Sequence, residues 1–393
     1  MIPYFEFQNS VKLLCGECSL ERIPSELEHL GAGRPLLLSD AVLAGTGVLD
    51  RVAEAMTAEG CPPAHTFTDI PVDSSLAVVN QLAALYREKS CDSLVAVGGG
   101  SVIDTAKGVR LVLSQQTDDI LALSGVENLT RGRHIPFLVV PTTAGTGSEC
   151  TGVAVIRNEV SQVKMEFLSP FVEPDVAVID PRMTESLPPR ATASTGLDAL
   201  CHAIESCTCL QDNPLSHAYG TAAIRLIVAH LETATRKGSD RHARYAMAVA
   251  STMAGISFSN SMVGAVHAFG HALGGICHVP HAVAMAILLP HVMRFNLSHA
   301  GRAYAELLPD LVGWEQALAT PAEKRAEAAI EAVVGLEQRL QEASGLPLRL
   351  RDVGVGEEQF PRVAVQALND GAIIVNPRSM TEEQVLSVLR AAY

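Results

Sequence analysis

Ser93-Leu-Val-Ala-Val-Gly-Gly-Gly-Ser101 decides how the first half of the chain folds. Its first five residues form a short apolar run that predicts a buried strand, and the run enters three consecutive glycines directly. Glycine lets the backbone turn sharply and lets a ligand approach it closely. A helical pattern follows over 103–114, so free amides are expected at a helix N-terminus, where a pyrophosphate binds. A tight structural turn would use the same residues.

Short apolar runs and amphipathic segments alternate around this stretch. The pattern predicts further strands at 35–38 and 136–140, and further helices at 49–59 and 76–89. Such alternation is typical of a parallel sheet covered by helices. Each strand ends in a loop rich in glycine, serine or threonine, and open α/β sheets bind their ligands at that edge.

Two other loops favour nucleotide binding. Residues 142–148, Thr-Thr-Ala-Gly-Thr-Gly-Ser, add hydroxyls and glycines after the strand at 136–140, and two convergent loops favour a ligand site over a turn. Asp40 follows the strand at 35–38, where a carboxylate can bind the adenosine ribose hydroxyls and repel a 2′-phosphate. Asp40 therefore favours NAD over NADP, although a helix N-cap explains it equally well.

The pattern changes near Pro181, and strand signals fade from Pro189 onward. Ala- and Leu-rich segments there predict helices at 197–208, 216–235, 241–257, 261–273 and 323–344. Pro280 and Pro290 are expected to break the segment that lies between the helices at 261–273 and 323–344. We therefore predict an α/β domain over 1–185 and an all-helical domain over 186–393.

Candidate metal ligands gather in the helical half. Asp198 and His202 stand four residues apart, so a helix presents both on one side; His267 and His271 repeat this spacing, and His281 follows. One carboxylate and several imidazoles suit a borderline divalent ion such as Fe²⁺ or Zn²⁺. A single buried histidine is more often a hydrogen-bonded core residue, but two such pairs in an apolar segment favour a metal site.

Spacing does not distinguish His267 from His271 as a ligand. Cys201, Cys277 and His278 are alternative ligands on chemical grounds. We interpret these three residues as packing residues or as neighbours that support the ligands.

Composition excludes several classes of protein. The chain has 393 residues, of which 48% are hydrophobic and 18% charged, as expected of a soluble globular protein. A formal charge of -14 argues against nucleic acid or an anionic membrane as partner. No signal peptide and no apolar run of about 18 to 20 residues is evident. Nine cysteines, an odd number, suit a reducing compartment, so we expect a cytoplasmic protein.

Several motifs together resemble the iron-containing, or group III, alcohol dehydrogenases. The similarity covers nearly the whole chain in order, in the segments 98–107, 141–149, 196–205, 266–274, 280–291 and the ending from Asn376-Pro-Arg378 to Tyr393. It implies an N-terminal Rossmann-like α/β domain with a parallel sheet and an all-α C-terminal domain, a dehydroquinate synthase-like architecture. Catalysis is implied in the cleft between these domains, and a homodimer or larger homo-oligomer is implied as well.

The resemblance also implies roles for individual residues. The metal ligands would be Asp198, His202, His267 and His281, while His271 would stand beside the nicotinamide and Phe258 near the substrate. The implied contacts to the cofactor are Gly98, Gly99, Gly100, Ser101, Asp104, Thr142, Thr143, Thr146 and Lys164.

The implied reaction is the reversible, NAD-dependent oxidation of a primary alcohol to an aldehyde, with hydride delivered to the nicotinamide. A metal would act as a Lewis acid that lowers the pKa of the alcohol. Iron is expected, with zinc as the alternative, and ligand chemistry also admits cobalt or manganese. We interpret His271 as a proton relay because of its spacing from His267 and its ordinary pKa range.

The sequence departs from the family at three places. Pro71-Val-Asp-Ser74 stands where some members have Pro-Asn-Pro-Thr, Gly152 stands where some diol-specific members carry asparagine, and Ala282 replaces a usual glycine. The first two weaken the transfer of any particular substrate. Alternative functions are a dehydrogenase of polyols or hydroxy acids, a metal-free enzyme like maleylacetate reductase, a metal-dependent hydrolase and a noncatalytic binding protein.

Overall fold

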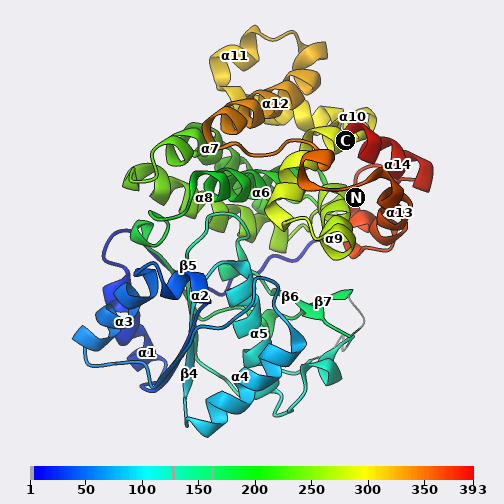
Figure 1. The fold of residues 1–393 in the computed structure, drawn as a ribbon. Helices are drawn as coiled ribbons and strands as arrows, with labels where there is room; N and C mark the ends of the chain where they lie inside the picture. The colour runs from blue at the N-terminus through cyan, green and yellow to red at the C-terminus, as the bar shows by residue number, and fades with distance from the viewer. Residues whose placement is uncertain (1–3, 126–128, 161–162) are drawn as a thin grey trace. The chain divides into compact units, whose positions relative to one another are not determined.

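The computed structural model describes residues 4–125, 129–160 and 163–393. The chain divides into an α/β unit, Asn9–Ser186, and a helical unit that comprises Leu187–Tyr393 together with Met1–Gln8. In Figure 1 the α/β unit runs from blue to blue-green, and the helical unit continues from green to red. Within the described ranges, no helix combines the length and the apolar character needed to span a membrane.

The apolar run at 93–97 forms strand β4 (Ser93–Gly98), which is buried along its whole length. It lies inside a six-stranded parallel sheet of order β1-β8-β5-β4-β2-β3. A strand buried on both faces needs apolar residues at every position, and this explains the continuous run. The other strands are β1 (Lys12–Cys15), β2 (Pro35–Leu38), β3 (His65–Phe67), β5 (Phe137–Pro141) and β8 (Val176–Ile179).

Helices cover both faces of this sheet. α1 (Ile23–His29) and α3 (Val48–Ala58) share one buried cluster with Val95 and Val97 of β4. Because neighbouring side chains of a strand point to opposite faces, the other face is left to α5 (Gly100–Ser114), which contacts β4 and β5. The remaining elements include α2 (Ala41–Ala44), α4 (Leu76–Glu88) and an antiparallel hairpin of β6 (Val153–Asn158) and β7 (Val163–Leu168).

The strand order reverses between β2 and β4. From β2 the chain continues to β3 on one side, whereas β4 pairs with the opposite side of β2. Open α/β sheets bind ligands at the carboxyl ends of the strands that flank such a reversal. The loops after β2 and β4, which begin at Ser39 and Gly99, lie at that point of the topology.

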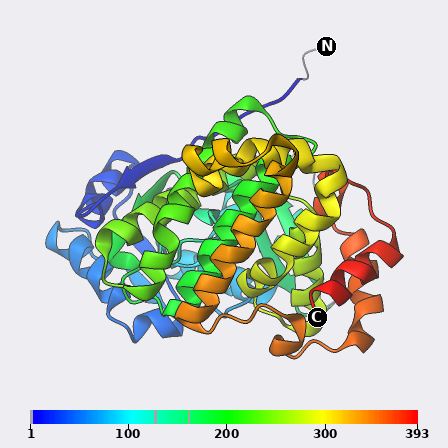
Figure 2. The same ribbon diagram turned by 90° about the horizontal axis from the view of Figure 1, so that it is seen from above.

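The helical unit is built around α6 (Pro189–Thr208), which is buried over most of its length. α6 packs against α7 (Pro214–Arg236), α8 (Arg241–Ser259) and α10 (His281–Val312). Figure 2 shows α12 (Arg325–Ser344) in orange between green α7 and yellow α10. The remaining helices include α9 (Ala265–Cys277), α11 (Trp314–Ala319), α13 (Phe360–Leu368) and α14 (Glu382–Ala391).

One local prediction was wrong. Pro290 does not separate two elements, because the helix α10 runs continuously from His281 to Val312 and contains both Pro290 and Pro309. A proline inside a helix removes one backbone hydrogen bond. Its neighbours from Val283 to Met293 are almost all buried against other helices, and this burial outweighs the loss. Pro280 does mark a boundary, since it is the N-cap of α10.

Candidate active site

One face of α6 carries four polar side chains. Asp198 is followed by Cys201, His202 and Glu205 at three, four and seven residues further on, so the four line one stripe of the helix, and all four are buried. Asp198 is 0% exposed, and within the described ranges neither of its carboxylate oxygens has a hydrogen-bond partner. An uncompensated polar group of this kind is expensive to bury.

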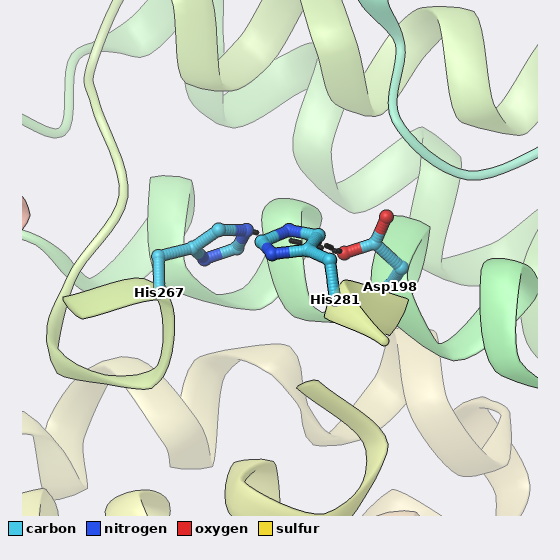
Figure 3. Close-up of side chains that lie close together, drawn as sticks. All are labelled: Asp198, His267 and His281. Carbon is cyan, nitrogen blue, oxygen red and sulfur yellow. Dashed lines mark ion pairs between the residues drawn. The ribbon is translucent and has the colours of Figure 1, made fainter. Parts of the chain in front are cut away.

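Two histidines from other helices point at the Asp198 carboxylate. Oδ1 of Asp198 lies 3.5 Å from Nε2 of His281, the first residue of α10, and 4.0 Å from Nε2 of His267 on α9. Figure 3 shows both imidazoles directed toward the carboxylate, and one ligand atom from each residue lies within 4.8 Å of the other two. Tetrahedral ligands bound at about 2.1 Å from Zn²⁺ stand about 3.4 Å apart. The three side chains therefore suit a metal ion.

The fourth predicted ligand, His202, lies beside this triad and is not part of it. Its ring centroid is 4.5 Å from that of His267. On its other side it stacks on Phe258 of α8, with 4.3 Å between centroids and 15° between planes. The structure thus places Phe258 against a candidate ligand.

The electrostatics of the triad fit a cation. Burial raises the pKa of Asp198 to about 7, and the nearby His267 and His271 only partly offset that rise. Nε2 of His267 is also buried with no hydrogen-bond partner in the part of the chain that the structure describes. A divalent ion would bind this nitrogen and the carboxylate together, so the donor set fits the metal that the sequence predicted.

Glu205 contacts the opposite edge of the His267 ring, a role that the sequence did not predict. Its Oε2 lies 2.5 Å from Nδ1 of His267, and its Oε1 accepts a 2.8 Å hydrogen bond from the amide of Val266. Cys201 lies on this same edge, with Sγ 4.0 Å from Nδ1. Burial raises the pKa of the Cys201 thiol well above its ordinary value. Cys201 is therefore an unsuitable ligand for an ion on the Nε2 side.

The other alternative ligands lie at the far end of α9. His278 is the C-cap of this helix, with a left-handed φ of 57°, and it is exposed. Cys277 is partly buried. Neither belongs to a group of potential ligands within the described residues.

His271 is held by an aspartate from the C-terminal part of the chain. Its Nδ1 lies 2.9 Å from Oδ2 of Asp370, and its ring stacks on His281 with 5.5 Å between centroids. Burial by itself would raise the pKa of Asp370, but the hydrogen bond and charge of His271, with the amide of Ala372, produce a net lowering. Asp370 was also missed by the sequence reasoning, because it follows α13 and carries no local signal.

In the α/β unit, the two predicted cofactor loops pack against each other. A Cβ atom on Gly99 would lie 3.3 Å from the Thr143 side chain, and one on Gly100 would lie 3.0 Å from Thr146. The amide of Thr142 donates to the carbonyl of Gly98 at 3.0 Å. The glycines therefore permit close packing of the loops, whatever ligand the loops hold.

Three other predicted cofactor residues have partners within the unit. Oδ1 of Asp40 accepts hydrogen bonds from two amides at the start of α2, so it caps that helix. Asp104 accepts from the Ser148 hydroxyl at 2.6 Å and from the Val155 amide at 3.0 Å. Lys164 forms a 3.0 Å ion pair with Asp73, the acidic residue of the divergent 71–74 segment.

A buried lysine reinforces the second predicted cofactor loop, 142–148. Lys107 is 0% exposed, and its Nζ donates to Ser148, Thr151 and the carbonyl of Val153 at 2.7–2.9 Å. Its ammonium lies 3.9 Å from Asp104. Lys107 and Asp104 therefore join α5 to the loop 142–148 and to the β6–β7 hairpin. These contacts explain why the 98–107 motif contains an aspartate and a lysine.

Family models match both halves of the chain. Residues 10–181 match the description "Iron-containing alcohol dehydrogenase", and residues 192–393 match "Fe-containing alcohol dehydrogenase family, C-terminal". The chain belongs to the iron-containing alcohol dehydrogenase family. Alcohol oxidoreduction is therefore its class of reaction, and the hydrolase and binding-protein alternatives receive no support.

Individual relatives of this alcohol dehydrogenase cover its whole length. It is 35% identical over 397 residues to 1,3-propanediol dehydrogenase of Klebsiella pneumoniae, covering 100% of this chain and 98% of the relative. It is 33% identical over 379 residues to NAD-dependent methanol dehydrogenase of Bacillus methanolicus, covering 96% and 97%. A crystal structure of 1,3-propanediol oxidoreductase superposes with a TM-score of 0.94 at 34% identity, covering 100% of both chains.

Because Asp198, His267 and His281 come from three helices, we expect a divalent metal bound by them to stabilise the helical unit. Asp198 should be needed for this effect. Zn²⁺ at about 1,000 times its Kd should raise the free energy of unfolding by about 4 kcal/mol, and Asp198→Asn should lose most of that gain. The measurement is thermal unfolding of metal-stripped protein with and without Zn²⁺. Asp310→Asn, which removes an aspartate paired with Arg225, is the control. Equal stabilisation of parent and Asp198→Asn would rule Asp198 out as a ligand.

Proposed function

We propose that this enzyme oxidises a primary alcohol to the aldehyde, reversibly, with NAD and a divalent metal held by Asp198, His202, His267 and His281. The observation that carries the proposal is the triad of buried Asp198, buried His267 and partly buried His281 in a chain of the iron-containing alcohol dehydrogenase family. Fe²⁺ is the metal that we propose first, with Zn²⁺ as the alternative, because imidazole and carboxylate ligands suit both.

A metal bound at this centre supplies a Lewis acid, which lowers the pKa of an alcohol and polarises the carbonyl of an aldehyde. The protein's own contribution is to hold the ligands in place from three helices before the metal arrives. Phe258 stacks on His202, and we propose that it fixes this ring and offers an apolar surface to the substrate. One carboxylate and three neutral imidazoles leave a divalent centre with a net charge of +1.

The proposal for NAD rests on the α/β unit. The loops after β2 and β4 flank the reversal of strand order, where such sheets bind dinucleotides. We propose that Gly98 to Ser101 and the N-terminus of α5 bind the pyrophosphate, with Thr142, Thr143 and Thr146 on the adenine and nicotinamide side. One oxygen of Asp40 caps α2, and we propose that the other oxygen binds the ribose hydroxyls, which favours NAD. Asp104 does not contact the cofactor in this proposal but supports the loop 142–148 through Ser148.

We propose that the substrates are short primary alcohols, diols included. Relatives of similar length are named for 1,3-propanediol and for methanol. At Gly152, where some diol-specific members carry asparagine, a Cβ atom would lie 3.1 Å from the carbonyl of Ser169. The backbone just after β7 therefore opposes a larger residue at this position.

The test of the function is NAD reduction by methanol, ethanol, 1-propanol and 1,3-propanediol, with metal-stripped protein reconstituted separately with Fe²⁺ and Zn²⁺. We expect turnover only with metal, and none in His267→Ala, because that variant removes one ligand nitrogen. His230→Ala, which removes a histidine packed on His242, should keep the parent rate. Turnover that survives stripping, or the absence of turnover with every alcohol and metal, would contradict the proposal.

We also propose that His271 relays the proton of the alcohol and that Asp370 orients it. His271→Ala should lower kcat by about 10²- to 10⁴-fold, the usual contribution of a positioned acid or base, while the bound metal stays at the parent level. Asp370→Asn should lower kcat less, because the imidazole remains. Asp212→Asn provides a matched control, since Asp212 makes a similar 3.0 Å contact to His217. Full turnover and an unchanged pH profile in His271→Ala would exclude the relay.

A further inference from the structure

Glu205 is buried at the N-terminus of the helix that carries His267. It lies on α6, seven residues beyond Asp198, and is 6% exposed. One of its oxygens accepts from the Val266 amide at 2.8 Å, and the other lies 2.5 Å from Nδ1 of His267. A single carboxylate therefore contacts both the backbone of α9 and the proposed ligand.

The start of α9 depends on side chains from other parts of the chain. Its N-cap, Gly264, has no side chain that could cap the helix. Glu205 accepts from the amide of Val266, and Oδ1 of Asn376 accepts from the amide of Ala265 at 3.2 Å. A Cβ atom on Gly264 would lie 2.9 Å from Glu205 and 3.1 Å from Asn376. Only glycine lets the two capping groups approach this closely.

The Asn376-Pro-Arg378 motif supplies the second cap. Asn376 and Asn296 of α10 exchange two side-chain hydrogen bonds of 2.9 Å. Arg378 donates to the carbonyl of Phe295 at 2.8 Å and lies 4.1 Å from the centre of that ring. These contacts fix Asn376 relative to α10, the helix whose first residue is His281. The motif therefore belongs to the support of the triad.

The contact of Glu205 with Nδ1 selects one form of the His267 ring. A carboxylate can only accept hydrogen bonds, so Nδ1 carries the hydrogen, and in the neutral ring Nε2 keeps its lone pair. Nε2 is the nitrogen that faces Asp198 at 4.0 Å. A carboxylate behind a ligating imidazole fixes both its tautomer and its orientation in many metal sites. The negative charge also suits the N-terminus of a helix.

We infer that Glu205 is a positioning residue that holds His267 with Nε2 directed at the metal, while Asn376 caps the same helix without touching the imidazole. This inference rests on the proposed function in one respect, namely that Nε2 of His267 binds the metal. Glu205 and Asn376 cap the same helix, but only Glu205 touches the imidazole. Loss of Glu205 should therefore weaken metal binding more than loss of Asn376 does. The two roles can therefore be separated by mutation.

Glu205→Gln changes the hydrogen bonding with little change in shape. The amide oxygen can accept from Val266 or from His267, but the NH₂ group then faces the other donor. If the NH₂ group faces the ring, it donates to Nδ1 and favours the tautomer with hydrogen on Nε2. In that tautomer Nε2 has no lone pair for a metal. The variant should therefore bind Zn²⁺ about 10- to 100-fold more weakly than the parent, as when such supporting residues are removed from other sites.

The experiment measures Zn²⁺ affinity of the metal-stripped full chain by competition with a chromogenic chelator, and thermal unfolding of the same samples without metal. Asn376→Ala should lower the unfolding temperature but change the affinity less than Glu205→Gln does. Glu337→Gln alters another glutamate, 4% exposed on α12, and should keep the parent affinity. Parent affinity in Glu205→Gln, or an equal loss in Asn376→Ala, would overturn the inference and leave the proposed function intact.

A second measurement keeps the inference testable if Glu205→Gln does not fold. Nitrogen NMR of histidine-labelled, metal-free parent protein reports which ring nitrogen is protonated, and the His267 signals are those lost in His267→Ala. At alkaline pH, where the ring is neutral, hydrogen on Nδ1 alone is expected, and hydrogen on Nε2 alone would overturn the inference. A parent protein that binds no Zn²⁺ in the competition assay would instead contradict the proposed function, and the positioning role would fall with it.

Discussion

The burial of one carboxylate, that of Asp198, constrains the whole helical unit. It lies on the central helix, fully inaccessible, and no hydrogen bond satisfies its oxygens within the described residues. Burying such a group is unfavourable unless positive charge is brought to it. Two other helices deliver the imidazoles of His267 and His281 to the same point. A divalent cation at this point would convert an unfavourable cluster into a stable link between three helices.

Support for this cluster comes from residues that do not face the point between the three ligand atoms. Glu205 and Asn376 fix the start of α9, and Asp370 holds His271. In the α/β unit, buried polar contacts likewise fix the loops proposed to bind the cofactor, since Lys107 and Asp104 both contact Ser148 in the loop after β5. In both units the residues proposed to bind ligands stand on elements whose positions are fixed by buried polar contacts. The reaction that we propose requires the cofactor and the metal centre to meet.

The sequence predicted those features whose signals are local. The apolar runs at 35–38 and 93–97 formed strands. Asp198 and His267 stood out because each has a histidine four residues further on, whereas His281 was noted because it follows Pro280. The edge strands β1 and β3 gave little signal because they are short and only partly buried. Glu205 and Asp370 act through partners 62 and 99 positions away. Glu205 stood within a segment that the sequence singled out, but only the three-dimensional structure shows what it contacts.

Anomalous diffraction from crystals of the zinc-loaded protein, recorded at the metal absorption edge, tests whether the metal binds at the triad. One strong peak is expected within bonding distance of Asp198, of Nε2 of His267 and of His281, with His202 as the fourth ligand. Nδ1 of His267 should remain on Glu205 in the same crystals. A peak elsewhere in the chain, or a loaded crystal with no peak between these side chains, would contradict the account.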